Sequence, residues 1–277
     1  MVCPTGTIGP RPVSKGSVRA ILEVRDLHKR FGAVTAVRGI TFEISSGEVL
    51  GVLGPNGAGK STIVKIATGM LEPSRGAVFF RGERIDREPS VYKRNLGYVP
   101  EQPELYGFLT GWEYLEMVAS LRRLDTRRAR EKAAALVEGF GLTGSRDLPI
   151  ASYSKGMRQR IVLISAFLHD PEVLVLDEPF SGLDVTSVLV LRRVIQRLAA
   201  RGKAVLFSSP VLEQVEQVCS HMLVLKRGAA VASGAVADVH AEFSGLGLER
   251  GFLQLTEQLD ADDVAETIVA AAVAPVR

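Results

Sequence analysis

The sequence predicts an α/β fold with a mainly parallel sheet at its centre. Two short apolar runs, residues 49–53 and 173–176, lack the alternation of a half-exposed strand, so each is expected to be a strand buried on both faces. A glycine-rich octapeptide follows the first run, and two consecutive acidic residues follow the second. Because open α/β sheets bind ligands at the carboxyl ends of their strands, both features are expected at one edge of the sheet.

The glycine-rich octapeptide fits the pattern GxxxxGK[ST] of a phosphate-binding loop. Its glycines allow positive φ angles and let backbone N–H groups approach the phosphates of a nucleotide closely. A helix expected at 61–68 follows, and its N-terminus also favours an anion. The loop predicts a P-loop NTPase core whose candidate nucleotide-binding residues are Gly54, Pro55, Asn56, Gly57, Ala58, Gly59, Lys60, Ser61 and Thr62.

Four side chains in these two motifs carry the expected chemistry. Lys60 places a positive charge on the phosphates and is both a binding and a catalytic candidate. Ser61 offers a hydroxyl to Mg²⁺, and Asp177 is expected to bind the same ion directly or through water. Glu178, the next residue, is placed to polarise an attacking water as a general base.

A third motif, at residues 153–160, reads Tyr-Ser-Lys-Gly-Met-Arg-Gln-Arg. Ser154 and Gly156 lie ahead of a helix expected at 161–168, so they predict a second anion site at a helix N-terminus. The three motifs in this order resemble those of ATP-binding-cassette (ABC) ATPases, in which a signature motif lies just ahead of the acidic pair. The resemblance runs from about residue 22 to about residue 234. The YSKGM form resembles the branch that powers export of drugs, polysaccharides and similar cargo.

The resemblance implies a fold and partners as well as a ligand. The implied fold is a P-loop NTPase core with an antiparallel β-subdomain and an inserted helical subdomain. Two copies would form a homodimer around two ATP molecules, with the phosphate loop of one copy facing Ser154 and Gly156 of the other. Phe31 matches the aromatic residue that stacks on adenine. Residues 181–184 match a loop that lies across the dimer interface.

Two positions depart from the pattern of the family. Its members place a glutamine that contacts Mg²⁺ and water in the region of residues 98–103, and here the role falls to either Glu101 or Gln102. Its members also carry a histidine after the strand that follows the acidic pair, whereas this chain has Pro210 there. Proline has no donor or acceptor in its side chain and no N–H, so the γ-phosphate contact cannot form in the same way.

The chain divides into three expected segments. Residues 1–20 are expected to be a disordered tail, and residues 236–277 a C-terminal helical segment. Residues 21–235 are expected to form the nucleotide-binding domain, which includes a helical subdomain at 103–157. Its antiparallel strands are predicted at 22–24, 40–44 and 78–80, and its parallel strands begin at 49, 173, 204 and 222.

Composition is that of a globular α/β protein and limits the expected partners. Hydrophobic residues make up 46% and charged residues 23% of the 277 residues, and no apolar run reaches the ~18 residues of a membrane helix. The net charge of +3 does not favour a nucleic-acid partner. Cys3 and Cys219 give neither a disulfide framework nor a metal spacing, which suits a reducing cytoplasm. The charge run at 122–132 is expected to be a solvated helix–loop–helix surface, and a face near anionic lipid headgroups or a membrane subunit is the alternative.

The sequence as a whole predicts the ATP-binding and ATP-hydrolysing subunit of an ABC transporter, with ATP and Mg²⁺ as cofactors. It would power export through a separate membrane-spanning permease, from the cytoplasmic face of the cell membrane. Pro210 motivates a second interpretation, a catalytically weak nucleotide-binding regulator. A soluble ABC protein of DNA repair or translation is a third, but such proteins usually carry long coiled-coil insertions or two cassettes in one chain.

Overall fold

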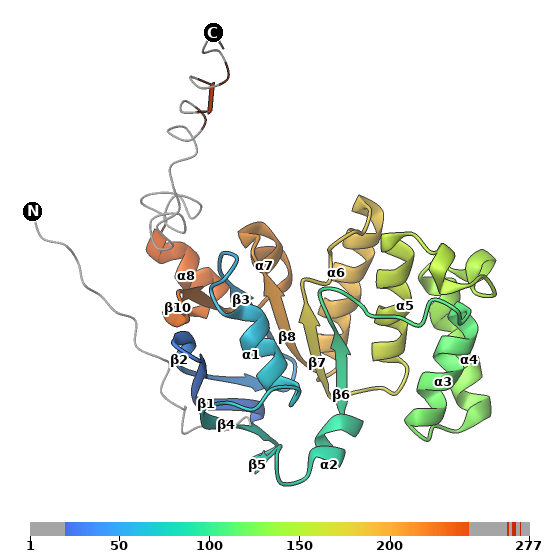
Figure 1. Cartoon of the computed structure of the whole chain (residues 1–277), viewed down its shortest axis with the longest axis horizontal. Coiled ribbons are helices and arrows are strands. Elements are labelled where there is room, and N and C mark those ends of the chain that lie inside the picture. Colours follow the sequence, from blue (N-terminus) through green and yellow to red (C-terminus); the bar gives the residue numbers. More distant parts are fainter. Residues whose placement is uncertain (1–19, 244–264, 266–267, 270–271, 273–277) are drawn as a thin grey trace, which may run out of the picture.

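The computed structural model describes residues 20–243 together with residues 265, 268, 269 and 272. These residues form two β-sheets with helices packed around them (Figure 1). The predicted disordered tail lies outside the described residues except for Ala20. The predicted C-terminal helical segment begins inside them, but most of it beyond residue 243 lies outside.

The first sheet is antiparallel and has the strand order β2-β1-β4-β5. Its strands are β1 (Ala20–Phe31), β2 (Val34–Ser45), β4 (Arg75–Phe80) and β5 (Glu83–Arg84). Residues at alternate positions, such as Ile40, Phe42 and Ile44 of β2, are buried, as expected for strands with one face against the core. The three predicted antiparallel strands are confirmed, although β1 and β2 are longer than the predicted segments.

The second sheet is mainly parallel and has the order β10-β9-β3-β8-β7-β6. Its strands are β3 (Val49–Leu53), β6 (Leu96–Val99), β7 (Val173–Asp177), β8 (Ala204–Ser209), β9 (His221–Lys226) and the antiparallel edge strand β10 (Ala229–Ala235). Every residue of β3, β7 and β8 is buried. This confirms the prediction that β3 and β7 are covered on both faces, and β8 is covered in the same way.

Two strands of this sheet, β6 and β10, were not predicted from the sequence. Strand β6 is short and contains Gly97, where a Cβ atom would lie 2.6 Å from the carbonyl oxygen of Ala166. Glycine fits this close approach but weakens the strand signal. Strand β10 reads Ala-Ala-Val-Ala-Ser-Gly-Ala, which has low strand propensity and is held by pairing with β9.

Helices cover both faces of the parallel sheet and extend beyond one end of it (Figure 1). They are α1 (Lys60–Ala67), α2 (Pro89–Arg94), α3 (Gly111–Leu121), α4 (Thr126–Gly139), α5 (Lys155–Phe167), α6 (Val185–Ala200), α7 (Leu212–Val218) and α8 (Val236–Phe243), with short 3₁₀ turns at Thr143–Ser145 and Ile150–Ser152. Within the described part of the chain, none of the helices combines the length and apolar character needed to span a bilayer.

Helix α5 begins at Lys155, earlier than the predicted start at residue 161. The Oγ atom of Ser154 accepts a hydrogen bond from the N–H of Met157 at 3.2 Å, so Ser154 is the N-cap. Gly156 therefore lies inside the first turn of the helix and not ahead of it, which corrects the prediction. Apolar periodicity could not show this, because the first residues of the helix are mostly polar and the cap sets its start.

Two hydrophobic clusters lie on the two faces of the parallel sheet. Val173 and Val175 of β7 join the cluster formed with α1 and the antiparallel sheet. Leu174 and Leu176 join the cluster formed with α3 to α7. Because successive side chains of a strand point to opposite faces, each central strand needs apolar residues at every position, and this explains the apolar runs in the sequence.

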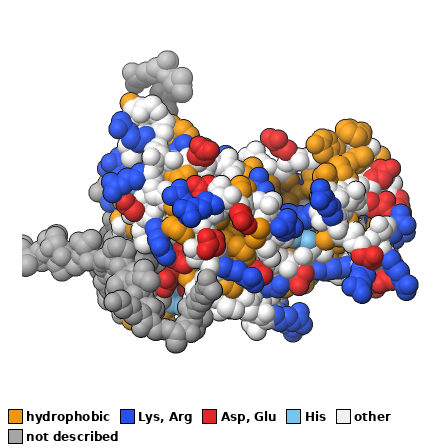
Figure 2. Space-filling view, turned by 90° about the horizontal axis from the view of Figure 1, so that it is seen from below, with side chains coloured by type: hydrophobic (Ala, Val, Ile, Leu, Met, Phe, Trp, Pro, Cys, Tyr) orange, Lys and Arg blue, Asp and Glu red, His pale blue; other side chains and the backbone are white. Residues whose placement is uncertain are grey.

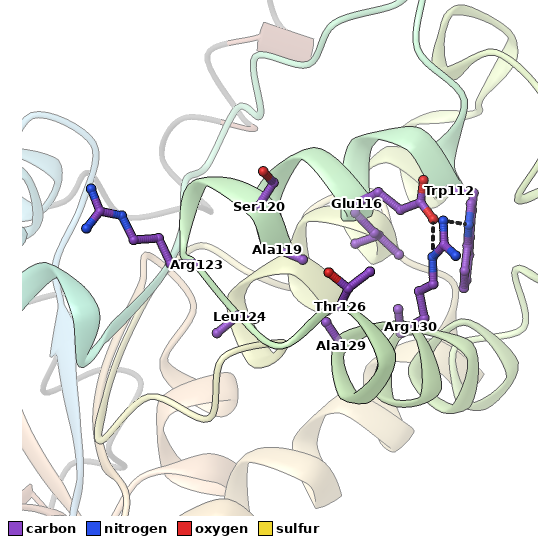
Figure 3. Close-up of a pocket in the computed structure, with 11 residues that line it drawn as sticks. Trp112, Glu116, Ala119, Ser120, Arg123, Leu124, Thr126, Ala129 and Arg130 are labelled. Atoms are coloured by element: carbon purple, nitrogen blue, oxygen red, sulfur yellow. Dashed lines mark hydrogen bonds and ion pairs between the residues drawn. The ribbon is translucent and has the colours of Figure 1, made fainter.

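Helices α3 and α4 lie at one end of the molecule, opposite the antiparallel sheet (Figure 1). An open cavity of about 400 Å³ lies between them, and small side chains such as Ala119 and Ala129 line it (Figure 3). At one end of this cavity Glu116 accepts hydrogen bonds from Trp112 Nε1 at 2.9 Å and Arg130 Nε at 2.7 Å. The charge run at 122–132 forms the mostly exposed turn between the two helices and the start of α4, as expected for a solvated surface.

His169 lies close to the end of α3 and to the start of β6. Its Nε2 atom lies 2.9 Å from the carbonyl oxygen of Leu96, which also accepts a hydrogen bond from Arg122 at 3.2 Å. The Nδ1 atom is buried and has no hydrogen-bond partner among the described residues. Burial lowers the pKa of His169 to about 4, and the positive charges of Arg122 and Lys132 act in the same direction. The imidazole is therefore neutral in the folded protein at neutral pH.

We expect this neutral histidine to make the folded protein sensitive to acid. Its folded pKa lies below the unfolded value of about 6.5, so its contribution is complete above pH ~6.5 and is lost as the pH falls towards 4. The loss should be on the order of 2–3 kcal/mol of unfolding free energy. Urea unfolding between pH 7.5 and 4.5 should show a steeper decline for the parent than for His169→Gln. Parallel pH profiles for the two proteins would contradict the assignment.

Candidate functional site

The phosphate loop connects the buried strand β3 to helix α1. Gly59 has a φ angle of 105°, and a Cβ atom there would lie 2.6 Å from the carbonyl oxygen of Ala36. Both the backbone angle and the space therefore require glycine. The N–H of Ile63 bonds to the carbonyl oxygen of Gly59 at 3.0 Å, so the helix starts directly from the loop. The predicted strand, loop and helix are confirmed.

Lys60 is only 5% exposed and lies between the loop and the acidic pair. Its Nζ atom donates hydrogen bonds to the carbonyl oxygens of Gly54 at 2.9 Å and Pro55 at 3.4 Å. The same atom lies 3.7 Å from Oε1 of Glu178. The loop therefore holds its own cation in place, within reach of the carboxylate predicted to be the base.

The acidic pair lies at the carboxyl end of β7. Asp177 is the last residue of the strand, and burial raises the pKa of its carboxyl group, while a hydrogen bond from Ser208 acts in the opposite direction. Glu178 follows with a φ angle of 46°, a left-handed conformation that is uncommon for a residue other than glycine. Burial also raises the pKa of Glu178, and the nearby charge of Lys60 lowers it. A carboxylate with a raised pKa is a better proton acceptor at neutral pH.

The loop and Glu178 line an open cavity of about 320 Å³, whereas Asp177 is not among its lining residues. Glu101 lines this cavity, and its negative charge acts to raise the pKa of both Asp177 and Glu178. Gln102 is not among the lining residues. The full lining consists of Ala36, Asn56, Gly57, Gly59, Lys60, Ser61, Thr62, Glu101 and Glu178.

The signature residues Ser154 and Gly156 do not line this cavity. They lie at the start of α5, which packs against the segment that follows Glu178. A Cβ atom on Gly156 would lie 2.8 Å from the carbonyl oxygen of Gly182, and Lys155 Nζ donates to Ser181 Oγ at 3.0 Å. The signature motif therefore contacts Ser181 and Gly182 of its own chain, which follow the acidic pair closely in the sequence.

Phe31 also lies apart from the cavity. It is the last residue of β1 and is 50% exposed, with Lys29 Nζ 5.1 Å from the centre of its ring. A half-exposed aromatic ring at this position is not a core residue. Its predicted contact with adenine remains a prediction.

Pro210 follows β8 directly, at the same edge of the sheet as the phosphate loop and the acidic pair. Ser209 closes the turn around it: its Oγ atom accepts from the N–H of Val211 at 3.0 Å and donates to Gln214 Oε1 at 2.7 Å. The strand predicted at 204–207 extends to Ser209, and Ser208 and Ser209 are both fully buried.

Sequence reasoning missed two residues of the site, Ser208 and Ala36. Ser208 ends a strand beside the acidic pair, and the rule that ligands bind at strand carboxyl ends could have pointed to it. Ala36 contributes a backbone carbonyl group and a small side chain from β2, and no sequence pattern marks that role. A phosphate loop, an acidic pair and a parallel sheet between helical layers together define a P-loop ATPase domain.

Comparisons with known proteins agree with this class. The profile of the family described as ABC transporter matches residues 37–181. The ABC transporter ATP-binding protein all4389 of Nostoc is 37% identical over 209 residues, which are 74% of this chain and 62% of that protein. NatA, an ABC transporter ATP-binding protein of Bacillus subtilis, is 32% identical over 225 residues, which are 79% of this chain and 92% of NatA.

A third relative is the linearmycin resistance ATP-binding protein LnrL of Bacillus subtilis, which is 33% identical over 81% of this chain and 72% of its own length. A solved structure of the ATP binding subunit of an ABC transporter superposes with a TM-score of 0.79 at 34% identity, covering 85% of this chain and 99% of that one. The chain therefore belongs to the ABC transporter family of ATP-binding proteins, and it contains the ATPase domain of that family.

We expect Lys60→Ala to weaken ATP binding roughly 10- to 100-fold, because it removes the cation held in the loop and its charge-assisted bonds to phosphate. Isothermal titration calorimetry with Mg-ATP measures this change. Lys65→Ala, on the exposed side of the same helix, is the matched control and should bind ATP like the parent. Equal affinities of the parent and Lys60→Ala would show that the nucleotide binds elsewhere.

Proposed function

We propose that this protein is the ATP-binding and ATP-hydrolysing subunit of an ABC transporter that powers export through a separate membrane permease. The observation that carries this proposal is the meeting of Lys60, Glu101 and Glu178 around one cavity beside Asp177. In the proposed reaction, the loop amides and Lys60 bind the phosphates of ATP. Glu178 takes a proton from the attacking water, and its raised pKa suits this role.

The oxygen atoms around the cavity fit Mg²⁺. Mg²⁺ in nucleotide sites is usually bound by one or two protein oxygens together with the phosphates of the substrate. The Ser61 hydroxyl and the Asp177 carboxylate would hold it, and it would neutralise the charge that develops on the phosphates. Glu101 lines the cavity and Gln102 does not, so we assign the third position near the metal to Glu101.

The position of the signature motif supports a homodimer. Ser154 is exposed at the N-terminus of α5 and does not line the cavity of its own chain. An exposed helix N-terminus with a serine cap is suited to bind a phosphate from outside the chain. We propose that Ser154 and Gly156 of one copy contact the ATP bound to the phosphate loop of the other copy, with Phe31 stacked on the adenine.

Export is the favoured direction of transport for two reasons. The signature reads Tyr-Ser-Lys-Gly-Met, the form that resembles exporter ATPases. One relative, LnrL, is named for resistance to linearmycin. Export of a compound from the cell would give resistance to it. In this proposal the protein lies at the cytoplasmic face of the membrane, and the permease selects the cargo.

Exposed aromatic residues mark the surface that we assign to the permease. Tyr106 is 55% and Phe108 is 79% exposed, and their rings are 5.8 Å apart. They lie between Glu101 and the helical end of the molecule, so a partner bound there would contact a segment that leads into the site. Figure 2 shows a group of hydrophobic side chains near the end where Figure 1 places α3 and α4, with charges of both signs beside it and over the rest of that face. Exposed apolar patches commonly mark protein–protein contacts.

We expect Phe108→Asp to weaken binding to the permease roughly 10- to 30-fold while ATP binding and folding stay unchanged, because a buried aromatic contact would become a charge. Co-purification of the tagged protein with its permease measures this. Met70→Asp changes an exposed apolar residue on the loop after α1 and should co-purify like the parent. Normal binding by Phe108→Asp would place the permease on another surface.

Pro210 supports a second candidate function, a nucleotide-binding regulator with weak hydrolysis. The side chain at position 210 cannot donate a hydrogen bond to a γ-phosphate, because proline carries no donor group. The two functions differ in turnover. The parent protein, alone and with its permease, should hydrolyse ATP if it is a transport ATPase, and no turnover in either state would favour the regulator.

We expect Glu178→Gln to lower ATP turnover about 10²- to 10⁴-fold with little change in ATP affinity, because the amide keeps the shape of the side chain but cannot accept the proton. An ATP-dependent dimer should accumulate, and size-exclusion chromatography with Mg-ATP detects it. Glu138→Gln, on the exposed surface of α4, is the control and should hydrolyse ATP like the parent. A monomeric Glu178→Gln protein with the parental rate would remove Glu178 from the role of base.

A further inference from the structure

Ser208 lies fully buried beside the acidic pair. It pairs with Asp177 of β7 on one side and with Val52 of β3 on the other, so it sits between the two strands that carry the site. Its Oγ atom donates a short hydrogen bond to Asp177 Oδ1. The same oxygen accepts a hydrogen bond from the N–H of Glu178 at 3.2 Å.

One hydroxyl group thus contacts both members of the acidic pair. A serine hydroxyl has one proton to donate and lone pairs to accept, and both are used here. An alanine or valine would fill a buried strand position without the cost of burying a hydroxyl, so the serine needs these partners to be tolerated. The two partners are the residues assigned to the metal and to the attacking water.

The bond to Glu178 acts on a strained residue. Glu178 has the left-handed φ angle of 46°, and its N–H is shared between the carbonyl oxygen and the Oγ atom of Ser208, each at 3.2 Å. Such a conformation persists only where the surrounding structure fixes it, and it sets the direction of the side chain. The bond to Asp177 has a similar effect, because it occupies Oδ1 and leaves Oδ2 to accept elsewhere.

We propose that Ser208 is a positioning residue that holds the Asp177 carboxylate towards the metal and the Glu178 side chain towards the attacking water. This proposal rests on the roles of Asp177 and Glu178 in the proposed function. Ser208 itself would touch neither the metal nor the water. Its place in the reaction is comparable to the hydrogen-bonded partners behind metal ligands, whose loss commonly costs 10- to 100-fold in metal affinity or activity.

The test compares Ser208→Ala with Ser208→Thr, which keeps the hydroxyl, and with Ser208→Cys, which keeps the volume with only a weak donor. Ser165→Ala removes another buried serine hydroxyl, in α5, whose partner is the carbonyl oxygen of Val162, and it serves as the control. Asp177→Asn is the reference for loss of the metal ligand. The measurements are kcat and KM for Mg-ATP, Mn²⁺ affinity in the presence of ADP by electron paramagnetic resonance, and thermal unfolding.

We expect Ser208→Ala to lower kcat and Mn²⁺ affinity roughly 10- to 100-fold, and the weaker metal binding should raise KM for Mg-ATP. Ser208→Thr should restore both quantities, Ser208→Cys should fall between, and Ser165→Ala should match the parent. A folded Ser208→Ala, or a folded Ser208→Cys if the alanine variant does not fold, with parental Mn²⁺ affinity and kcat would overturn the proposal. If Asp177→Asn also binds Mn²⁺ normally, the assignment of Asp177 fails as well, which separates the two failures.

Discussion

Hydrogen bonds between β8 and its two parallel neighbours hold the site together. Strand β3 leads into the phosphate loop, and β7 ends in the acidic pair, so the two groups come from distant parts of the chain. Only the pairing of both strands with β8 places their carboxyl ends side by side. The register aligns Leu53 with Ser209 and Asp177 with Ser208, which fixes the depth of the loop relative to the carboxylates.

This pairing depends on burial from both sides. Alternate side chains of β3, β7 and β8 enter two separate hydrophobic clusters, and the helical layer and the antiparallel sheet cover them. The carboxylates at the end of the sheet lie at the edge of this apolar environment, which is the main reason that the pKa of Asp177 and of Glu178 is raised. The packing that stabilises the sheet and the electrostatics of the site therefore have the same origin.

The signature helix is held against the same strand end. Gln159, buried in α5, donates to the carbonyl oxygen of Pro179 at 3.1 Å, and Lys155 donates to Ser181. A movement of α5 would thus be transmitted to the residue directly after Glu178. In a dimer in which α5 contacts the nucleotide of the other copy, these bonds connect that nucleotide to the acidic pair of this chain, and so they provide a physical route between the two sites.

The sequence alone determined which residues carry the chemistry of the site. The glycines of the loop, Lys60 and the pair Asp177 and Glu178 were predicted because each role requires a particular residue type next to a buried strand. The buried strands β3 and β7 were predicted for the same reason, since a strand covered on both faces leaves an uninterrupted apolar run.

The tertiary structure decided what depends on neighbours far along the chain. It added β6 to the sheet despite its glycine, because pairing with β7 outweighs a weak local propensity. It placed Glu101 and not Gln102 at the cavity, because that choice depends on the direction of the backbone after β6. It also placed Ser208 against Asp177 and Glu178. Strand pairing brings together residues that no local sequence pattern relates, so the role of a serine on a buried strand can be inferred only once its neighbours are known.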